Sequence, residues 1–333
     1  MEYEITIIVL VYNVENYIER CIRSLLEQTL NERIQYVIVN DCTPDRSIEI
    51  LHQIMAFYPE RIPDIKIINH DTNKGSATAR NTGLMHATGR YIGWVDSDDW
   101  VEANMFEKLY DAAQKHNADL VWCDFYNTGM DSETRQFQHC KENKMAFIQS
   151  VLTGTLHGGV CFSIVRKEIY SNHAIRFPDG LNVMEDKLVL IKLAFFSEKI
   201  THVPFAYYHY EKDNTNSLTT NWDHDLAIQK VAMTNLQSTF DFLNHTALKL
   251  KFRNHIRYAK LIYKKNLLNS LELKSFQRWR ELFKEANNYV LCCPNMTLRQ
   301  KILGLNISLG WWMVAKIWIH YKKRTIDKKT CHE

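Results

Sequence analysis

Short apolar runs alternate with helix-length segments through the first 125 residues, and this pattern constrains the fold more than any other feature. The runs are rich in β-branched residues, and the segments between them carry apolar residues every three or four positions. Predicted strands cover residues 5–11, 36–39, 65–68, 91–95 and 120–123. Strands about 25–30 residues apart, with helices between them, form βαβ crossovers. The sequence therefore predicts an α/β fold with a doubly wound, mainly parallel sheet.

Polar residues follow each of the first four predicted strands. These positions are Tyr12 and Asn13, Asn40 and Asp41, 71–74, and 96–99. Ligands of parallel sheets bind outside the carboxyl ends of the strands, so the four groups predict one shared binding site. The first strand is followed neither by G-x-G-x-x-G nor by G-x-x-x-x-G-K-[ST], which disfavours a Rossmann dinucleotide site and a P-loop.

Three carboxylates come directly after the fourth strand, at Asp96, Asp98 and Asp99. Carboxylates this close repel one another unless a cation neutralises them. Mg²⁺ and Mn²⁺ prefer oxygen ligands and are often held by one or two carboxylates together with substrate phosphates. The D-x-D spacing is also compatible with a solvated acidic turn that caps a helix, but its place at the sheet edge favours a metal site.

Several segments between residues 5 and 100 together carry a family resemblance. They are residues 7–13, 24–29, 39–45, 73–83 and 89–99. In these segments and in their order, the chain resembles a family 2 glycosyltransferase of the GT-A fold, of the type that builds bacterial cell-surface polysaccharides. The resemblance implies a GT-A-like nucleotide-sugar-binding and catalytic domain over residues 1–225.

The resemblance also implies roles for single residues at the nucleotide end of the site. Asp41 resembles the aspartate that accepts a hydrogen bond from the nucleotide base, with Tyr12 and Asn13 beside it. Arg80 resembles the arginine at the nucleotide edge. A packed aromatic ring for Tyr12 and a structural ion pair for Arg80 are the alternatives.

At the metal end, Asp98 resembles the principal metal-contacting aspartate, and Asp96 resembles the aspartate directed towards ribose and metal. The resemblance implies a divalent cation, Mn²⁺ or Mg²⁺, at these two residues. Asp99 is expected to have a structural role.

A second acidic motif, Glu185-Asp186, precedes an apolar helical segment over residues 188–196. It is similar to the family motif whose aspartate deprotonates the acceptor hydroxyl. This implies Asp186 as the catalytic base, supported by Glu185. The alternative is that these acidic residues stand at the start of the helix because they interact favourably with its dipole.

The stretch from Tyr207 to Thr219 resembles the family's aromatic segment, but Glu211 stands where the family usually has an arginine. His209 or Lys212 could supply the missing diphosphate contact, and a histidine within an aromatic cluster is the alternative for His209. Cys42 also replaces a common glycine and has less conformational freedom in a turn.

The implied function is metal-dependent, inverting transfer of a sugar from a nucleotide-diphosphate donor, such as a UDP-sugar, to an acceptor hydroxyl. The transferred group would be a hexose or N-acetylhexosamine, added to a glycan or to a lipid-linked acceptor in polysaccharide biosynthesis. Two alternatives stay open at this point. One is a metal-dependent nucleotidyltransferase or phosphohydrolase, and the other is a non-catalytic nucleotide-sugar-binding protein.

Charge is distributed unevenly between the two parts of the chain. Residues 1–225 contain 21 Lys and Arg and 32 Asp and Glu, whereas residues 226–333 contain 20 and 6. We therefore predict a basic, helical C-terminal region over 226–333. Its last part, residues 299–329, combines Trp with Lys and Arg, which is typical of a helix in a membrane interface. Docking on the catalytic domain is the alternative, and nucleic-acid binding lacks a supporting motif.

Eight cysteines occur without any C-x-x-C pair, which favours reduced thiols over disulfides or a zinc ribbon.

The N-terminus is acidic and resembles no signal peptide, and no run of 18 uncharged apolar residues exists. The expected location is the cytoplasm, with peripheral contact on the inner face of the plasma membrane.

Overall fold

The structure, a computed structural model, describes residues 3–30, 33–130, 132–214 and 226–330. The chain forms two compact units, residues Met1–Val151 with Leu156–Asp241, and Leu152–Thr155 with Phe242–Glu333. The boundary differs from the predicted division at 225/226, because most of helix α8 (Leu226–Asn244) belongs to the first unit. Asn235 of this helix donates hydrogen bonds to the carbonyls of Leu181 and Val183 there.

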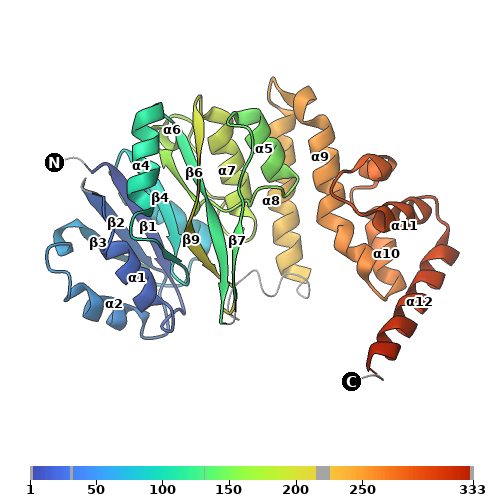
Figure 1. The fold of residues 1–333 in the computed structure, drawn as a ribbon, viewed down its shortest axis with the longest axis horizontal. Helices are drawn as coiled ribbons and strands as arrows, with labels where there is room; N and C mark the ends of the chain where they lie inside the picture. The colour runs from blue at the N-terminus through green and yellow to red at the C-terminus, as the bar shows by residue number, and fades with distance from the viewer. Residues whose placement is uncertain (1–2, 31–32, 131, 215–225, 331–333) are drawn as a thin grey trace. The chain divides into compact units, whose positions relative to one another are not determined.

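The first unit is built on a nine-stranded sheet (Figure 1). Its strands are β1 (Ile5–Val11), β2 (Ile34–Asn40), β3 (Ile65–Asn69), β4 (Tyr91–Asp96), β5 (Trp100–Val101), β6 (Leu120–Gly129), β7 (Ser132–Gln136), β8 (Ser163–Arg166) and β9 (Ile200–Glu211). They lie in the order β3-β2-β1-β4-β8-β6-β9-β5, and β7 pairs with β6.

The doubly wound arrangement is confirmed, and the sheet is parallel from β3 through β2 and β1 to β4. Beyond β4 it is mixed, because β8 pairs antiparallel with both β4 and β6. β6 and β9 are parallel, whereas β7 and β5 are antiparallel to their neighbours. The alternation of strands and helices in the sequence therefore describes only the first half of the sheet.

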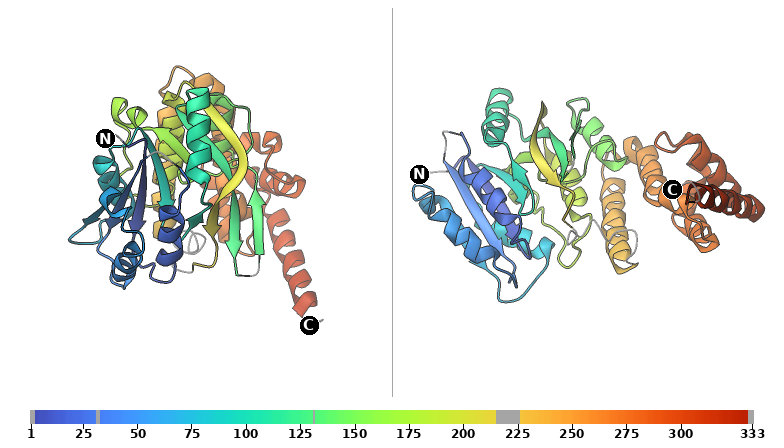
Figure 2. Two further views of the ribbon diagram at one scale, coloured as in Figure 1. Left: turned by 60° about the vertical axis from the view of Figure 1, so that its left-hand side comes forward. Right: turned by 60° about the horizontal axis from the view of Figure 1, so that its bottom comes forward.

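Seven helices of the first unit precede α8. They are α1 (Ile18–Leu26), α2 (Ser47–Met55), α3 (Ser76–His86), α4 (Met105–His116), α5 (Lys144–Leu152, ending one residue into the second unit), α6 (Lys167–Asn172) and α7 (Glu185–Phe196). Helices α1 and α2 pack side by side (Figures 1 and 2). Helix α3 packs on β1 and β2. The side chains of Ile7, Ile8 and Val9 in β1 are fully buried, as expected for a strand covered on both faces.

Strand register brings the carboxyl ends of the parallel strands to one edge of the sheet. Val11 pairs with Asn40, Asn40 pairs with Asn69, and Leu10 pairs with Asp96. The residues that follow these strands therefore start from one edge, as the sequence predicted.

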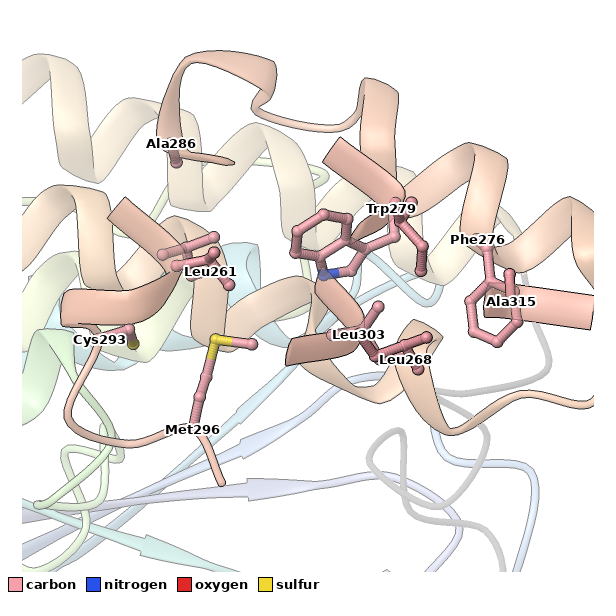
Figure 3. Packing of buried hydrophobic residues seen from close by; sticks show 11 residues of the cluster. Leu261, Leu268, Phe276, Trp279, Ala286, Cys293, Met296, Leu303 and Ala315 are labelled. Carbon is pink, nitrogen blue, oxygen red and sulfur yellow. The ribbon is translucent and has the colours of Figure 1, made fainter. Parts of the chain in front are cut away.

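The second unit is helical and has its own core. It contains α9 (Lys249–Lys264), α10 (Leu273–Glu281), α11 (Leu298–Ser308), α12 (Trp312–Thr330) and 3₁₀ segments at Lys265–Asn269 and Lys284–Cys292. Figure 3 shows the side chains that form this core, including Trp279 and Phe276 of α10, Leu303 of α11 and Ala315 of α12. Across the described residues, no helix has both the length and the apolar character needed to cross a bilayer.

Gly83 tests the packing of α3 on the sheet. A Cβ at this position would lie 2.3 Å from Cγ2 of Ile8 in β1. Alanine is preferred over glycine in a helix by about 1 kcal/mol, but overpacking costs about 1–3 kcal/mol. We expect Gly83→Ala to lower the free energy of unfolding by about 1 kcal/mol in thermal or urea denaturation. Met85→Ala, at an exposed position of the same helix, should change it by less than about 0.5 kcal/mol; equal effects would contradict the close packing.

Candidate active site

The turn after β4 is fixed by Asp99, which is buried. Its carboxylate accepts hydrogen bonds from the Tyr208 hydroxyl (2.5 Å) and from the Glu211 N–H (2.8 Å), both on β9. The same hydroxyl accepts a bond from the N–H of Asp96. Burial, followed by the charges of Asp98 and Asp96, raises the pKa of Asp99. Asp99 thus joins the turn to β9, which agrees with the expected structural role.

Arg80 of α3 brings the two acidic motifs together. Its buried guanidinium donates to Glu185 Oε1 (2.6 Å) and to Asp96 Oδ1 (3.0 Å), and it lies 3.3 Å from Asp186 Oδ1. Three carboxylates from β4 and α7 therefore share one cation. The carboxylates pair with two guanidinium nitrogens of Arg80, whereas its Nε has no hydrogen-bond partner among the described residues. This arrangement agrees with the alternative of a structural ion pair, and the contact of Arg80 with the nucleotide stays a prediction.

The loop before α7 is tied to α3 by further hydrogen bonds. Asn81 bonds to both the N–H and the carbonyl of Phe177, and Thr78 donates to Asp179. The N–H of Ala77 donates to Asn182 Oδ1. These contacts bring the second acidic motif to the edge of the sheet, although it lies about 90 residues after the first in the sequence.

Two backbone conformations support this junction. Gly75, before α3, has a φ of +84°, and a Cβ there would lie 2.3 Å from Asn182 Nδ2. Met184, before α7, has a φ of +61°, which is uncommon for a residue with a side chain. Strained positions of this kind cluster at functional sites, and Met184 directly precedes Glu185 and Asp186.

Asp186 has the environment of a general base. Burial raises the pKa of its carboxyl to about 8; Arg80 opposes this rise, and Glu185 and Asp96 add to it. Its Oδ1 accepts no hydrogen bond among the described residues. A carboxylate with a pKa near the working pH is suited to taking a proton from a hydroxyl.

Asp98 and Asp96 fit a divalent cation in combination with a substrate. Burial, followed by the charge of Asp96, raises the pKa of Asp98, so a cation would stabilise this pair. Asn214 donates to one oxygen of Asp98, and Arg80 to one oxygen of Asp96. The described part of the chain contains no group of three or more His, Cys, Asp or Glu side chains arranged for a metal. Further ligands would have to come from substrate phosphates or water, as is usual for Mg²⁺.

The predicted nucleotide residue Asp41 lies buried at the end of β2. It accepts hydrogen bonds from the N–H groups of Lys74 and Gly75, both at 2.8 Å. The Nδ1 atom of His70 lies 2.7 Å from Asp41 Oδ1, and its Nε2 atom lies 2.9 Å from the hydroxyl oxygen of Thr82. Sequence reasoning missed His70; its only signal was its position directly after β3.

Tyr12 and Asn13 lie at the same edge, as expected. Tyr12 is 46% exposed, so its ring is available to a ligand. Asn13 has a φ of +56° and donates its N–H to Thr43. Cys42 also adopts a left-handed conformation, with a φ of +57°, which explains why glycine would suit this position.

His209 does not join the acidic site. Its ring is stacked on Trp100, with 3.4 Å between centroids, and its two nitrogens each lie 2.9 Å from a carboxylate, Glu133 and Glu102. The predicted diphosphate contact is therefore not supported for His209, which is held in an aromatic cluster instead. Glu211, in the place of the family arginine, pairs with Arg20 of α1 at 2.8 Å. Residues 215–219 of the predicted aromatic segment lie outside the described residues.

Comparison with known proteins agrees with this geometry. Residues 6–173 match the family described as Glycosyl transferase family 2. Over 251 residues the chain is 33% identical to a Bacillus subtilis (strain 168) protein described as the uncharacterized glycosyltransferase EpsJ, covering 73% of this chain and 71% of EpsJ.

Solved structures share the fold at low sequence identity. TarS 1-349 of S. aureus, in complex with UDP-GlcNAc, matches with a TM-score of 0.58 and 17% identity, over 92% of both chains. The mannosyltransferase PcManGT of Pyrobaculum calidifontis, in complex with GDP-Man and Mn²⁺, matches with a TM-score of 0.56 and 14% identity, over 96% of this chain and 84% of that one. The chain thus belongs to glycosyl transferase family 2 and is a glycosyltransferase with the GT-A fold.

Proposed function

We propose that this enzyme transfers a hexose or N-acetylhexosamine from a UDP-sugar to an acceptor hydroxyl in polysaccharide biosynthesis, with inversion at the anomeric carbon and dependence on a divalent cation. The observation that carries the proposal is the ion cluster around Arg80, in which the guanidinium pairs with both Asp96 and Asp186. Asp98 follows Asp96 two positions later in the same turn. This arrangement supports a cation site for the leaving diphosphate and a base for the acceptor within one active site.

The donor nucleotide is assigned to the edge formed by Tyr12, Asn13, Asp41 and Asp96. Asp41 would accept from the base, and the exposed ring of Tyr12 would cover it. The His70 contact and the two backbone bonds hold the Asp41 carboxylate in place. Lys212 remains the candidate for a diphosphate contact from β9.

Asp98 and Asp96 would hold the divalent cation. When bound, the cation supplies positive charge that stabilises the leaving diphosphate and orients it. Asp186 would take the proton of the acceptor hydroxyl as the oxygen attacks the anomeric carbon. The residues proposed to act in the reaction include one base and no nucleophilic side chain, which is consistent with single displacement and inversion.

The proposed reaction can be tested by product analysis. With Mn²⁺ and a panel of nucleotide sugars, we expect release of a nucleoside diphosphate that increases when acceptor is added and stops with EDTA. Asp98→Asn should lower this release by about 10²-fold or more, since loss of a bound metal removes several kcal/mol of charge stabilisation. Asp111→Asn, at an exposed position of α4, is the matched control. Release of pyrophosphate instead would indicate nucleotidyl transfer, and binding without turnover would indicate a non-catalytic protein.

The role of Asp186 can be tested by substitution and by pH. Asp186→Asn should lower kcat by about 10²–10⁴-fold while UDP binding in calorimetry is retained. In the wild type the base is active when deprotonated, so kcat/KM should rise with pH and level off above about 8, the raised pKa of Asp186. A rise that ends near pH 4, the ordinary range of a carboxyl, would contradict the environment described for this residue.

We also propose that the second unit contacts an anionic membrane surface on the cytoplasmic side. Large apolar side chains of α11 and α12 and their junction are exposed: Leu298, Ile302, Trp311, Met313, Ile317 and Tyr321. Exposed basic residues, including Lys316, lie among them. Trp312 and Trp318 instead pack on the core of the unit and are partly buried, so Trp311 is the most exposed tryptophan in the described part of this region.

This membrane contact can be tested by co-sedimentation with phosphatidylglycerol vesicles. Substitution is preferable to truncation, since removing the end of the chain would delete Leu303, Ile307 and Ala315 from the core. Trp311→Ser combined with Met313→Ser and Ile317→Ser should abolish sedimentation, because burial of each such side chain contributes about 1.5–3 kcal/mol. Leu250→Ser, at another exposed apolar position of this unit, is the control. Equal sedimentation of the triple variant and the wild type would contradict the proposal.

A further inference from the structure

The carboxylate of Asp41, which is assigned to the nucleotide base, is largely occupied by the protein itself. Its Oδ1 accepts hydrogen bonds from the N–H of Lys74 (2.8 Å) and from Nδ1 of His70 (2.7 Å), and its Oδ2 accepts one from the N–H of Gly75 (2.8 Å). Because a carboxylate only accepts hydrogen bonds, His70 must carry a proton on Nδ1. The side chains of Asp41 and His70 are both 6% exposed, so water competes little for these bonds.

The three donors to Asp41 are held in fixed positions. Nε2 of His70 lies 2.9 Å from the hydroxyl oxygen of Thr82 in α3, so the imidazole ring is held at both nitrogens. The other two donors are successive backbone N–H groups directly before α3, where the φ of +84° at Gly75 turns the chain. The carboxylate is therefore fixed in its orientation before any ligand binds.

The acceptor positions that remain on Asp41 limit the bases that it can bind. A carboxylate offers about four such positions, two on each oxygen. The three bonds fill both positions on Oδ1 and one on Oδ2, which leaves one position on Oδ2 without a partner among the described residues. Uracil presents a single ring N–H, which can occupy this position. Guanine presents two neighbouring N–H donors, which need one position on each oxygen, and an unpaired donor in a closed site is costly.

We infer that His70 determines the preference of this enzyme for uracil over guanine, because it occupies the position on Asp41 Oδ1 that guanine would need. This inference rests on the proposed contact between Asp41 and the base. His70 acts through Asp41 and is therefore a positioning residue. Lys74 and Gly75 contribute only backbone groups to Asp41, so His70 is the side chain through which this selectivity can be changed.

The inference can be tested with UDP and GDP as probes. The full-length protein is titrated calorimetrically with each nucleotide in the presence of Mg²⁺, and the ratio of the two dissociation constants is compared between variants. We expect the wild type to bind UDP more tightly by about tenfold or more, and His70→Leu to reduce this preference by about tenfold, because the released carboxylate can turn both oxygens towards guanine. His70→Asn should keep the preference, since its shape is close to that of Leu but its amide can donate to Asp41.

Thr82→Val is a second test, because it removes the bond to Nε2 of His70 at nearly constant volume; it should reduce the preference by a smaller factor. His52→Leu, at an exposed position of α2, is the matched control and should keep the wild-type ratio. Melting temperatures would verify that the variants are folded.

Three results would each overturn the inference: no preference for UDP in the wild type, an unchanged ratio in His70→Leu, or an equal loss of preference in His70→Leu and His70→Asn. Asp41→Ala tests the proposed function separately. Unchanged UDP binding in Asp41→Ala would contradict the assigned nucleotide contact. Weaker UDP binding in Asp41→Ala together with an unchanged ratio in His70→Leu would reject only the role of His70.

Discussion

The ion cluster around Arg80 is the interaction on which the arrangement of the site depends. One buried guanidinium is shared by carboxylates at the end of β4 and at the start of α7, two elements with no sequence proximity. A buried cation without its partners, or buried carboxylates without their cation, would each cost several kcal/mol. The sheet edge, the loop of residues 177–185 and the start of α7 are therefore held as one unit. One positive charge for three carboxylates also leaves a local excess of negative charge, which favours a bound cation and a raised pKa at Asp186.

Much of this site could be predicted from the sequence because the features that define it are local. The βαβ half of the sheet follows from strands of β-branched residues at regular spacing, and the carboxyl ends of β1 to β4 then meet by geometry alone. Family resemblance added the roles of Asp96, Asp98 and Asp186, which composition and spacing could not supply. The family and the GT-A fold are confirmed; the individual roles stay predictions.

The remaining features depend on pairing between distant segments, to which a single sequence gives little access. β8 and β9 pair with strands that are more than 30 residues away, and β7 pairs with β6 in a hairpin. This pairing is antiparallel except between β6 and β9, and it left no periodic signal in the sequence. The ion pair of Arg80 could not be recognised in the sequence because its partner Glu185 is 105 residues distant. His209 was ambiguous for the same reason, since Glu102 and Glu133 approach it only in the folded chain.

The left-handed conformation of Met184 also bears on how this part of the chain can change over evolution. Its backbone, rather than its side chain, sets the entry of α7 and so the direction of the acidic pair that follows. Glycine and asparagine accept that conformation readily, whereas valine and isoleucine do not. Sequence drift at position 184 should thus be limited by backbone geometry and not by hydrophobicity, so an apparently conservative exchange of one apolar residue for another could disturb the site more than a change to a small polar residue.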